Sequence, residues 1–373
     1  MNTRRRTSPR RTPGVRQHGV ALLAAMLTVT LVATLAAAAL WQQWRAVEVE
    51  TAERARLQSS WVLIGALDWS RLILREDGRT PGADHLAEPW AIALEEARLS
   101  TFLAAERSPP GEVADTLPEA FLSGRIVDAQ SKLNVLNLVE IGKPVPEAVA
   151  AFTKLFGLLG LPAQDLAVMI ASLQRVFPAP SPSNPTAGNA SATPTASTAA
   201  AAAATPAASA ASSAGSATAT LDPSVSIEAD APLLPQRMSQ LPWLGVSPAT
   251  ATALEPYVTV LPVRTALNIN TASAEALFAS VPSLDLAGAQ RLVAQRSRSF
   301  FRTLSDGSEA LGSTLRFVDG QHGVSSSFFE THGRLRIDRN WVEERSLLRR
   351  NGVEVVILWR ERGAGATTPG PGR

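Results

Sequence analysis

The imidazole and thiol groups that most often hold metals or act in catalysis are sparse in this sequence. Cysteine is absent, which excludes disulfides, thiolate metal ligands and thiol nucleophiles. No histidine has a second histidine three or four residues away, the spacing that places two imidazoles on one helix face for zinc. The four histidines are His18, His85, His322 and His332. These residue types predict no zinc site and no metal ligands.

Carboxylate pairs that could act as acid and base are also poorly placed. Glu95–Glu96 and Glu343–Glu344 are adjacent in sequence, and adjacent side chains on a helix or strand point apart. We therefore expect both pairs on solvated faces and not in a carboxylate dyad. The patterns of serine hydrolases, zinc proteases, P-loop proteins and kinases are absent. The sequence predicts no catalytic residue, and we expect that the protein is not an enzyme.

A phosphate-binding turn is suggested by residues 268–272, Asn-Ile-Asn-Thr-Ala, and the helix pair expected after them. This segment resembles the helix-hairpin-helix module of DNA-uptake proteins, in which a Gly-hydrophobic-Gly turn brings backbone amides to a phosphate. Here the turn reads Pro282-Ser283-Leu284-Asp285, without glycine and with an added negative charge. Acidic residues also surround the nearby basic ones, Arg291, Arg296 and Arg298. We expect a two-helix packing unit and no nucleic-acid binding.

The distribution of charge supports that view. Residues 1–19 contain six arginines and no carboxylate, whereas the remaining chain has 29 Lys and Arg against 33 Asp and Glu. The basic isoelectric point of about 9.5 therefore reflects a short leader. The body of the protein has no basic field that would attract nucleic acid.

The first structural element that the sequence predicts is an apolar helix. Residues 20–41 form an uncharged run of 22 residues, long enough to cross a bilayer. The basic residues before it predict that the chain after it lies in the periplasm. Three interpretations are open: a cleaved secretory signal with Ala36–Ala39 as the processing site, a signal anchor, or a prepilin leader.

The helical pattern continues beyond the apolar run, from Trp41 to about Glu76, and the run from Asp77 to Gly82 ends it. Trp41 and Trp44 are expected at the bilayer edge. A helical stripe is expected to lie against a sheet. It consists of Leu57, Trp61, Ile64, Leu67 and Leu72. A cleaved signal peptide does not predict such a continuation.

Further along the chain, residues 124–139 predict strand–turn–strand, with Ala129–Lys132 as the turn and Asn134 and Asn137 closing backbone hydrogen bonds. Amphipathic helices are expected to start at Pro146 and Pro162. Residues 178–220 contain only Ala, Ser, Thr, Pro, Gly and Asn and predict a disordered linker.

The last third of the chain predicts short helices followed by strands. Thr271 is placed to cap a helix running through Leu277, and a tight turn at Asn351–Gly352 is expected between the last two strands. The expected helices are Pro248–Leu254 and Leu286–Arg296, and the expected strands are Val324–Ile337, Trp341–Arg349 and Val353–Trp359.

Taken in order, these features resemble one family, the minor pseudopilin K (general secretion pathway protein K) of type II secretion systems. The matching features are the leader glycine in Arg16–Leu23, the long helix, the acidic-Pro-Trp segment 84–90, the Asn-paired hairpin and the Asn-Ile-Asn-Thr-Ala module. The resemblance implies an α+β fold: a long pilin-like helix against a small antiparallel sheet, with a large inserted all-α domain.

The resemblance also implies boundaries. Residues 1–19 would be the leader, 20–77 the transmembrane and amphipathic helix, and 78–143 the first part of the sheet. The inserted helical domain would occupy 144–177 and 221–320, interrupted by the 178–220 linker. Residues 321–362 would complete the sheet, and 363–373 would be a disordered tail.

For function, the resemblance implies a structural subunit at the tip of the pseudopilus, assembled with other minor pseudopilins and anchored by one helix in the inner membrane. Prepilin peptidase would cut between Gly19 and Val20. The fifth mature position, Ala24, lacks the glutamate of most pilins, as is typical of the K family. No cofactor is expected. Members of the family can bind a calcium ion, but the Asp-rich segment that they usually have in the region corresponding to residues 178–220 is replaced here. The alternatives are a type IV pilus minor pilin, a membrane-anchored DNA-binding protein of an uptake system, and a secreted protein starting near residue 40.

Overall fold

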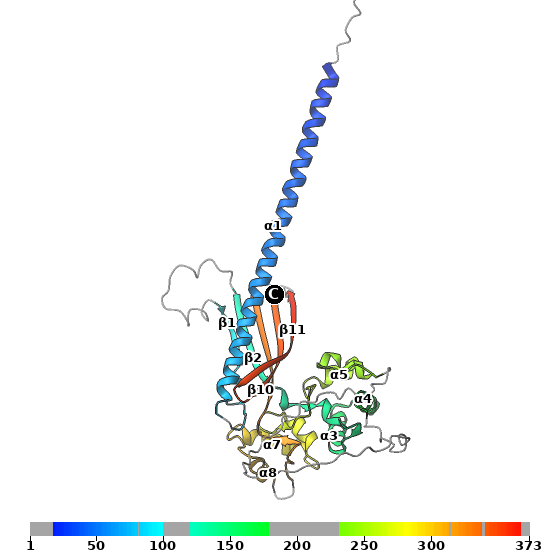
Figure 1. Ribbon diagram of the computed structural model, residues 1–373, viewed down its shortest axis with the longest axis vertical. Helices are drawn as coiled ribbons and strands as arrows, with labels where there is room; N and C mark the ends of the chain where they lie inside the picture. The colour runs from blue at the N-terminus through cyan, green and yellow to red at the C-terminus, as the bar shows by residue number, and fades with distance from the viewer. Residues whose placement is uncertain are drawn as a thin grey trace, which may run out of the picture. The chain divides into compact units, whose positions relative to one another are not determined.

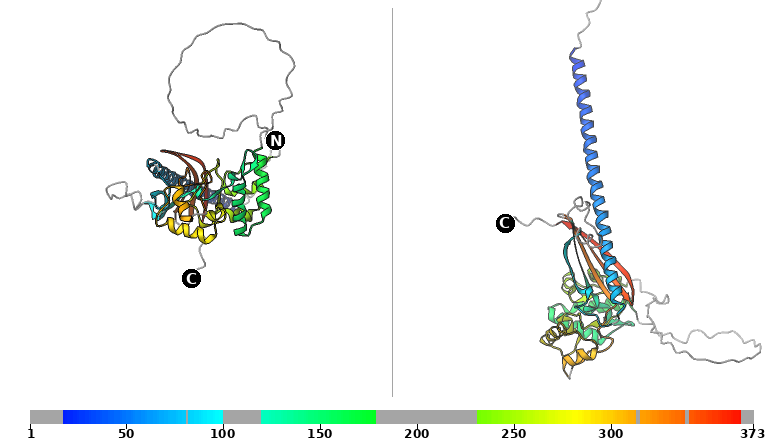
Figure 2. Two further views of the ribbon diagram at one scale, coloured as in Figure 1. Left: turned by 90° about the horizontal axis from the view of Figure 1, so that it is seen from below. Right: turned by 90° about the vertical axis from the view of Figure 1, so that its left-hand side faces the viewer.

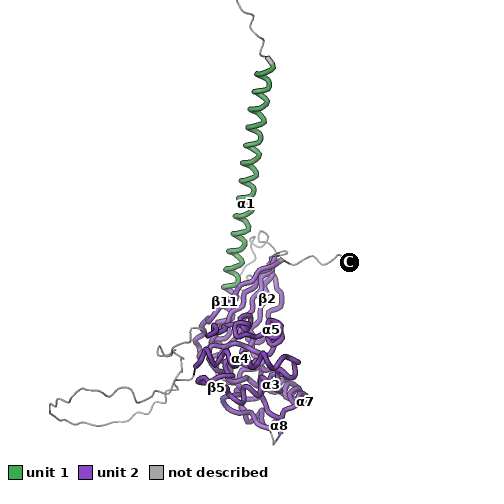
Figure 3. Tube along the Cα trace, turned by 90° about the vertical axis from the view of Figure 1, so that its right-hand side faces the viewer, with its two compact units in different colours: residues 1–64 green, residues 65–373 purple. Residues whose placement is uncertain are grey.

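The computed structural model describes residues 18–80, 82–99, 120–178, 231–312, 315–337 and 340–366. The chain divides into two compact units, residues 1–64 and residues 65–373 (Figure 3). The first unit contains most of helix α1 (His18–Asp77). The second contains the end of α1, a sheet and several short helices. The predicted linker, apart from Pro178, and most of the predicted leader lie outside the described residues.

Five strands, paired antiparallel throughout, form the main sheet in the order β1-β2-β9-β10-β11 (Figure 1). Gly352 has a φ of 57° in the turn between β10 and β11, a left-handed conformation that favours glycine. The predicted hairpin is present, but its turn lies one residue later than expected, because Asn351 pairs with Glu354 and leaves Gly352 and Val353 as the turn. The α+β fold class is confirmed. The strands are β1 (Leu94–Arg98), β2 (Ala120–Asp128), β9 (Phe328–Ile337), β10 (Asn340–Asn351) and β11 (Glu354–Ala366).

The end of α1 packs on this sheet through a small apolar core. Leu67 and Leu74 of α1 are buried with Trp90, which lies in the short 3-10 helix η1 (Pro89–Ala91) before β1, and with side chains of the sheet face such as Phe329. Trp90 meets Phe329 edge to face, with ring centroids 5.2 Å apart. Leu67 and Leu74 are seven residues apart, about two helical turns, so they share one face.

The predicted apolar stripe of α1 is therefore only partly right. Leu67 is buried, but Leu72 is 50% exposed, because it lies roughly 160° around the helix from Leu74. In the first unit, Leu57 and Trp61 are exposed too. Of the predicted stripe, Leu67 packs on the sheet together with Leu74, whereas Leu72 lies on another face of the helix.

A helical domain is inserted in sequence between β2 and β9, and its elements gather beyond one end of the sheet (Figures 1 and 2). Helices α5 and α7 have the predicted bounds, and α3 starts at Pro146 as predicted. Helix α4 starts at Ala163, one residue after the predicted Pro162, which is its N-cap. The helices are α3 (Pro146–Leu159), α4 (Ala163–Val176), η4 (Met238–Leu244), α5 (Pro248–Leu254), α6 (Ala274–Ser280), α7 (Leu286–Arg296) and α8 (Leu304–Leu311).

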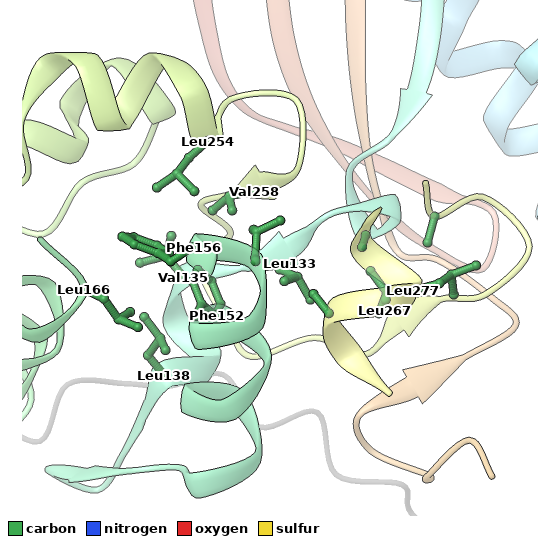
Figure 4. Close-up of a cluster of buried hydrophobic side chains, with 14 of the residues drawn as sticks. Leu133, Val135, Leu138, Phe152, Phe156, Leu166, Leu254, Val258, Leu267 and Leu277 are labelled. Atoms are coloured by element: carbon green, nitrogen blue, oxygen red, sulfur yellow. The ribbon is translucent and has the colours of Figure 1, made fainter. Parts of the chain in front are cut away.

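One large apolar core holds the inserted domain together (Figure 4). Phe152 and Phe156 of α3 lie one turn apart and pack with Leu166 of α4 and Leu254 of α5. Segments from both sides of the undescribed 179–230 region contribute to this core, so the two parts of the inserted domain form one packed body.

The segment after β2 departs from the predicted strand–turn–strand. The turn is present as a short 3-10 helix, η2 (Ala129–Ser131), but the second strand, β3 (Leu133–Asn134), has only two residues. It pairs in parallel with β6 (Val258–Thr259) of the inserted domain and not with β2. The predicted hairpin is therefore wrong, and the helical domain begins soon after Asp128, before the predicted residue 144.

The C-terminal strand is longer than predicted. β11 continues to Ala366 and pairs there with the start of β10, so Gly363–Ala366 are not part of a frayed tail. The ring of Trp341 on β10 lies over this stretch, since a Cβ at Gly365 would stand 2.5 Å from it. Residues 367–373 lie outside the described part of the chain.

Candidate functional site

The first unit presents an exposed apolar helix surface. Every described side chain from Gly19 to Leu57 is exposed, and α1 is long and apolar enough to cross a membrane. The hydroxyls of Thr28, Thr30 and Thr34 each donate to a carbonyl three residues earlier, so their polar atoms are satisfied within the helix. Gly19, Val20 and Ala24 lie in its first turns. Processing at Gly19–Val20 stays a prediction.

The second unit contains a buried polar junction between the sheet and the inserted domain. Arg350 of β10 lies at its centre: it donates to a carboxylate oxygen of Asp77, to Oδ1 of Asp84 at 2.5 Å and to the carbonyl of Ser326 at 2.9 Å. The amide of Ser326 donates to the other oxygen of Asp84 at 2.6 Å. We call this the domain junction; it consists of Asp77, Asp84, Glu88, Asp128, Asn268, Thr271, Ser326 and Arg350.

Asp128, the last residue of β2, is the carboxylate that ties the junction to the inserted domain. Its Oδ2 accepts from Thr271 Oγ1 at 2.5 Å, from Ser326 Oγ at 2.6 Å and from Asn268 Nδ2 at 3.0 Å. Its Oδ1 accepts from the amide of Gln130 at 2.7 Å. Burial raises the pKa of Asp128, and the hydrogen bonds offset only part of this rise, so that the pKa is about 6.

Three acids of the junction have the proximity expected of metal ligands. Oxygens of Asp77, Asp84 and Glu88 lie within 4.8 Å of one another. The guanidinium of Arg350 already pairs with Asp77 and Asp84, however, and Glu88 accepts from the indole of Trp90 at 2.6 Å. Calcium takes six to eight oxygen ligands, so this donor set fits a guanidinium better than a metal. The possible calcium ion stays a prediction without an assigned site.

The Asn-Ile-Asn-Thr-Ala segment enters the junction, and its predicted cap is wrong. Ser273 caps α6, because its hydroxyl accepts from the amide of Ala276 at 3.2 Å. The Thr271 hydroxyl donates to Asp128 instead. Asn270 holds the segment between α7 and α8 in place by exchanging two hydrogen bonds with the backbone of Phe301, at 2.8 and 2.9 Å.

The turn between α6 and α7 is held from within the protein. The ammonium of Lys154, on α3, donates to the carbonyls of Phe278, Val281 and Leu284 at 2.5, 2.9 and 3.2 Å. Asp285 caps α7 by accepting from the amide of Gly288 at 2.8 Å. A carboxylate therefore takes the helix N-terminus that a phosphate would need.

The basic residues near this turn are partly consumed as well. Arg296 donates to the carbonyl of Ile269 at 2.7 Å, and burial lowers its pKa to about 10. The expected two-helix packing unit is what these contacts describe, and they leave no phosphate cradle at residues 282–285.

The paired asparagines close backbone hydrogen bonds, as predicted. Asn134 donates to the carbonyl of Val263 at 2.7 Å and accepts from the amide of Leu261 at 3.2 Å. Asn137 exchanges two bonds with the backbone of Thr265, at 2.8 and 3.1 Å. Both side chains therefore hold residues 261–265 against the segment that contains Asn134 and Asn137.

The two acid pairs form no dyad, but one expectation about them is wrong. Glu344 is only 4% exposed in its side chain, and Arg360 and Arg362 donate to its two oxygens, each at 2.6 Å at the closest. Glu343, its neighbour, faces the other side of the sheet beside Arg345. Glu95 and Glu96 are exposed as expected, and Glu96 pairs with Arg336 at 2.5 Å.

An open cleft of about 840 Å³ lies between the other sheet face and the η4–α5 segment. Several of its polar groups have partners within the cleft: Lys132 donates to the backbone carbonyl of Glu255 at 2.8 Å, and His332 lies 3.2 Å from Glu330. We find no nucleophile beside a base among these lining residues.

The architecture defines a class of protein. An exposed apolar helix, a helix end packed on an antiparallel sheet, and a helical domain inserted between strands of that sheet describe a pilin-like subunit of the pseudopilin type. Two family models, each described as type II secretion system (T2SS), protein K, match residues 131–263 and 267–325, together slightly more than half of the chain. The chain belongs to the type II secretion system protein K family.

Individual relatives agree with this assignment. The type II secretion system protein K of Pseudomonas aeruginosa is 25% identical over 364 residues, which cover 94% of each chain. A chain of the GspK-GspI-GspJ complex from enterotoxigenic Escherichia coli matches with a TM-score of 0.50 and 18% identity. It covers 84% of this chain and 98% of that one, and the likeness concerns the fold. The protein is therefore a minor pseudopilin of type II secretion, and the pilus and DNA-uptake alternatives are not favoured.

Proposed function

We propose that this minor pseudopilin occupies the tip of the pseudopilus and assists export of proteins across the outer membrane. Helix α1 anchors it in the inner membrane by a single span, with the sheet and the inserted domain in the periplasm. Membership of the protein K family is the observation that carries the proposal. The protein acts as a structural component and not as an enzyme.

Processing by prepilin peptidase between Gly19 and Val20 is part of this proposal. The purified membrane-extracted protein should begin at Val20 in N-terminal sequencing and intact mass. Gly19→Val should retain the leader, whereas Ala39→Leu should be processed normally. A mature start near residue 40 that is lost in Ala39→Leu would identify a secretory signal, and an uncleaved chain would identify a signal anchor.

The tip position is consistent with Ala24. A charge within the bilayer costs about 2.5–3.5 kcal/mol on insertion scales unless a partner compensates it. A tip subunit has no subunit above it, and therefore no neighbouring amino terminus that could form an ion pair with a glutamate. An alanine at position 24 then loses no interaction.

The partners are other minor pseudopilins, as the assembly named for the Escherichia coli structure suggests. Because the α1 face opposite Leu74 exposes Leu72, Leu72→Glu should reduce co-purification of full-length chain with the other minor pseudopilins of the same secretion system. Leu158→Glu, at an exposed leucine of α3, is the matched control. Equal co-purification of both variants and wild type would contradict a docking role for α1.

A further inference from the structure

The charge balance of the domain junction is unusual for a buried site. Its four carboxyl groups are Asp77, Asp84, Glu88 and Asp128. Among the described residues the cation in contact with this group is Arg350, which pairs with Asp77 and Asp84. The nearby imidazole of His85 adds no second cation at neutral pH, because burial lowers its pKa. Burying ionised carboxylates without cations is unfavourable, so the site favours protonated forms.

Asp128 is the group with the least compensation. It is 2% exposed, and within the described part of the chain its four hydrogen-bond donors, Gln130, Asn268, Thr271 and Ser326, are all neutral. The same contacts connect β2 to the inserted domain through Asn268 and Thr271, and to the start of β9 through Ser326. The protonation state of one carboxyl group therefore bears directly on how the inserted domain is held.

We propose that the domain junction takes up protons as it forms, so that the inserted helical domain is held to the sheet more tightly in mildly acidic than in neutral surroundings. A protonated Asp128 still fits its hydrogen-bond partners: its hydroxyl donates to the oxygen of Thr271, whose own hydroxyl turns to the carbonyl of Asn268, 3.5 Å away. No partner is lost, and the buried charge is removed.

The direction follows from the shifts. The pKa of Asp77 and of Asp128 is raised from 3.8 to about 6, chiefly by burial, and that of Glu88 is raised by burial. A folded-state pKa above the unfolded one gives stability that is present below the unfolded pKa and lost as pH rises through the folded pKa. As the pH rises from 5 to 7.5, ionisation of each of the two aspartates should lower the equilibrium constant for folding by about tenfold.

The test isolates Asp128, because the buried His322 has the opposite pH dependence. Unfolding constants of the full chain in detergent are measured by urea titration at pH 5 and pH 7.5 for wild type and Asp128→Asn. The unfolding constant of Asp128→Asn, divided by that of wild type, should be about tenfold smaller at pH 7.5 than at pH 5. Glu309→Gln, at an exposed glutamate of α8, should show no such change. If the ratio of the unfolding constants of Asp128→Asn and wild type is the same at both pH values, the proposal is overturned.

A second measurement needs no variant and covers the case in which Asp128→Asn fails to fold. Hydrogen–deuterium exchange of the wild-type chain is followed for peptides covering 267–272 and 326–329, with the α3 peptide 146–159 as reference. After correction for intrinsic exchange, the junction peptides should lose at least about tenfold more protection than the α3 peptide between pH 5 and pH 7.5. Parallel loss in all three peptides would refute proton uptake at the junction.

Discussion

Lys154 is the side chain whose removal best tests how the inserted domain is built. Its ammonium donates to three backbone carbonyls at the α6–α7 turn, those of Phe278, Val281 and Leu284, and it lies 4.2 Å from the centroid of the Phe278 ring. Burial lowers the pKa of Lys154, which indicates that the ammonium is partly withdrawn from water. Lys154→Met keeps the length of the apolar stem and removes all three donors.

The expected cost follows from the contacts. A hydrogen bond from a charged donor contributes about 1.5–3 kcal/mol, and an unsatisfied buried carbonyl costs about 1–3 kcal/mol. Lys154 is only half-buried, so water can reach some of the exposed carbonyls. We expect Lys154→Met to lower the free energy of unfolding by about 2–4 kcal/mol. Lys154→Arg should also destabilise, because a planar guanidinium cannot aim three N–H groups from one atom.

The assay is urea unfolding of the full chain at neutral pH, comparing midpoints at unchanged slope. Lys143→Met, at an exposed lysine of the same domain, is the control and should change the free energy of unfolding by no more than about 0.5 kcal/mol. If Lys154→Met is as stable as Lys143→Met, then the three carbonyl contacts do not hold the turn, and the description of this helix pair as a packing unit is wrong.

Three further predictions use the same assay. Gly78→Ala should destabilise by about 2–4 kcal/mol, because its Cβ would stand 2.2 Å from the carbonyl oxygen of Gly352, whereas Gly65→Ala, which meets nothing within 4 Å, should be neutral or stabilising. Asn134→Ala should cost about 3 kcal/mol, since it strips partners from Leu261 and Val263; full stability would contradict its bridging role. Burial lowers the pKa of His322 from 6.5 to about 4, so stability should fall by about 3 kcal/mol as pH drops through that window, and His322→Gln should abolish this loss.

Local signals in the sequence were sufficient for elements whose boundaries depend on local chemistry. Proline at the start of α3, the hairpin turn at Gly352 to within one residue, and the bounds of α7 needed no knowledge of distant partners. The prediction failed where a distant partner decides. Thr271 has the chemistry of a helix cap, but the buried Asp128 takes its hydroxyl and leaves the cap to Ser273. β3 alternates like half of a hairpin, yet its partner β6 lies more than a hundred residues later.

The domain junction was not predicted from sequence for the same reason. Asp77 reads as a helix end, Asp128 as a strand end before a turn and Arg350 as a polar residue before a hairpin. Each is ordinary in its own segment, and only the folded chain brings the three together. The one usable signal was Asp128 itself, a charge that directly follows the apolar pair Ile126–Val127, but the turn after it explains an aspartate equally well.

The helix pair α6–α7 shows how the same local architecture loses one function while it keeps another. A phosphate-binding turn needs free amides, a free helix N-terminus and cations directed outward. Here the N-terminus of α7 is capped by Asp285, Arg296 is directed inward to the carbonyl of Ile269, and the positive charge of Lys154 reaches the turn from inside the domain. Asp285, Arg296 and Lys154 thus each satisfy backbone atoms of this protein. The turn is therefore suited to rigid packing, which is what a structural subunit of a secretion filament requires of its largest domain.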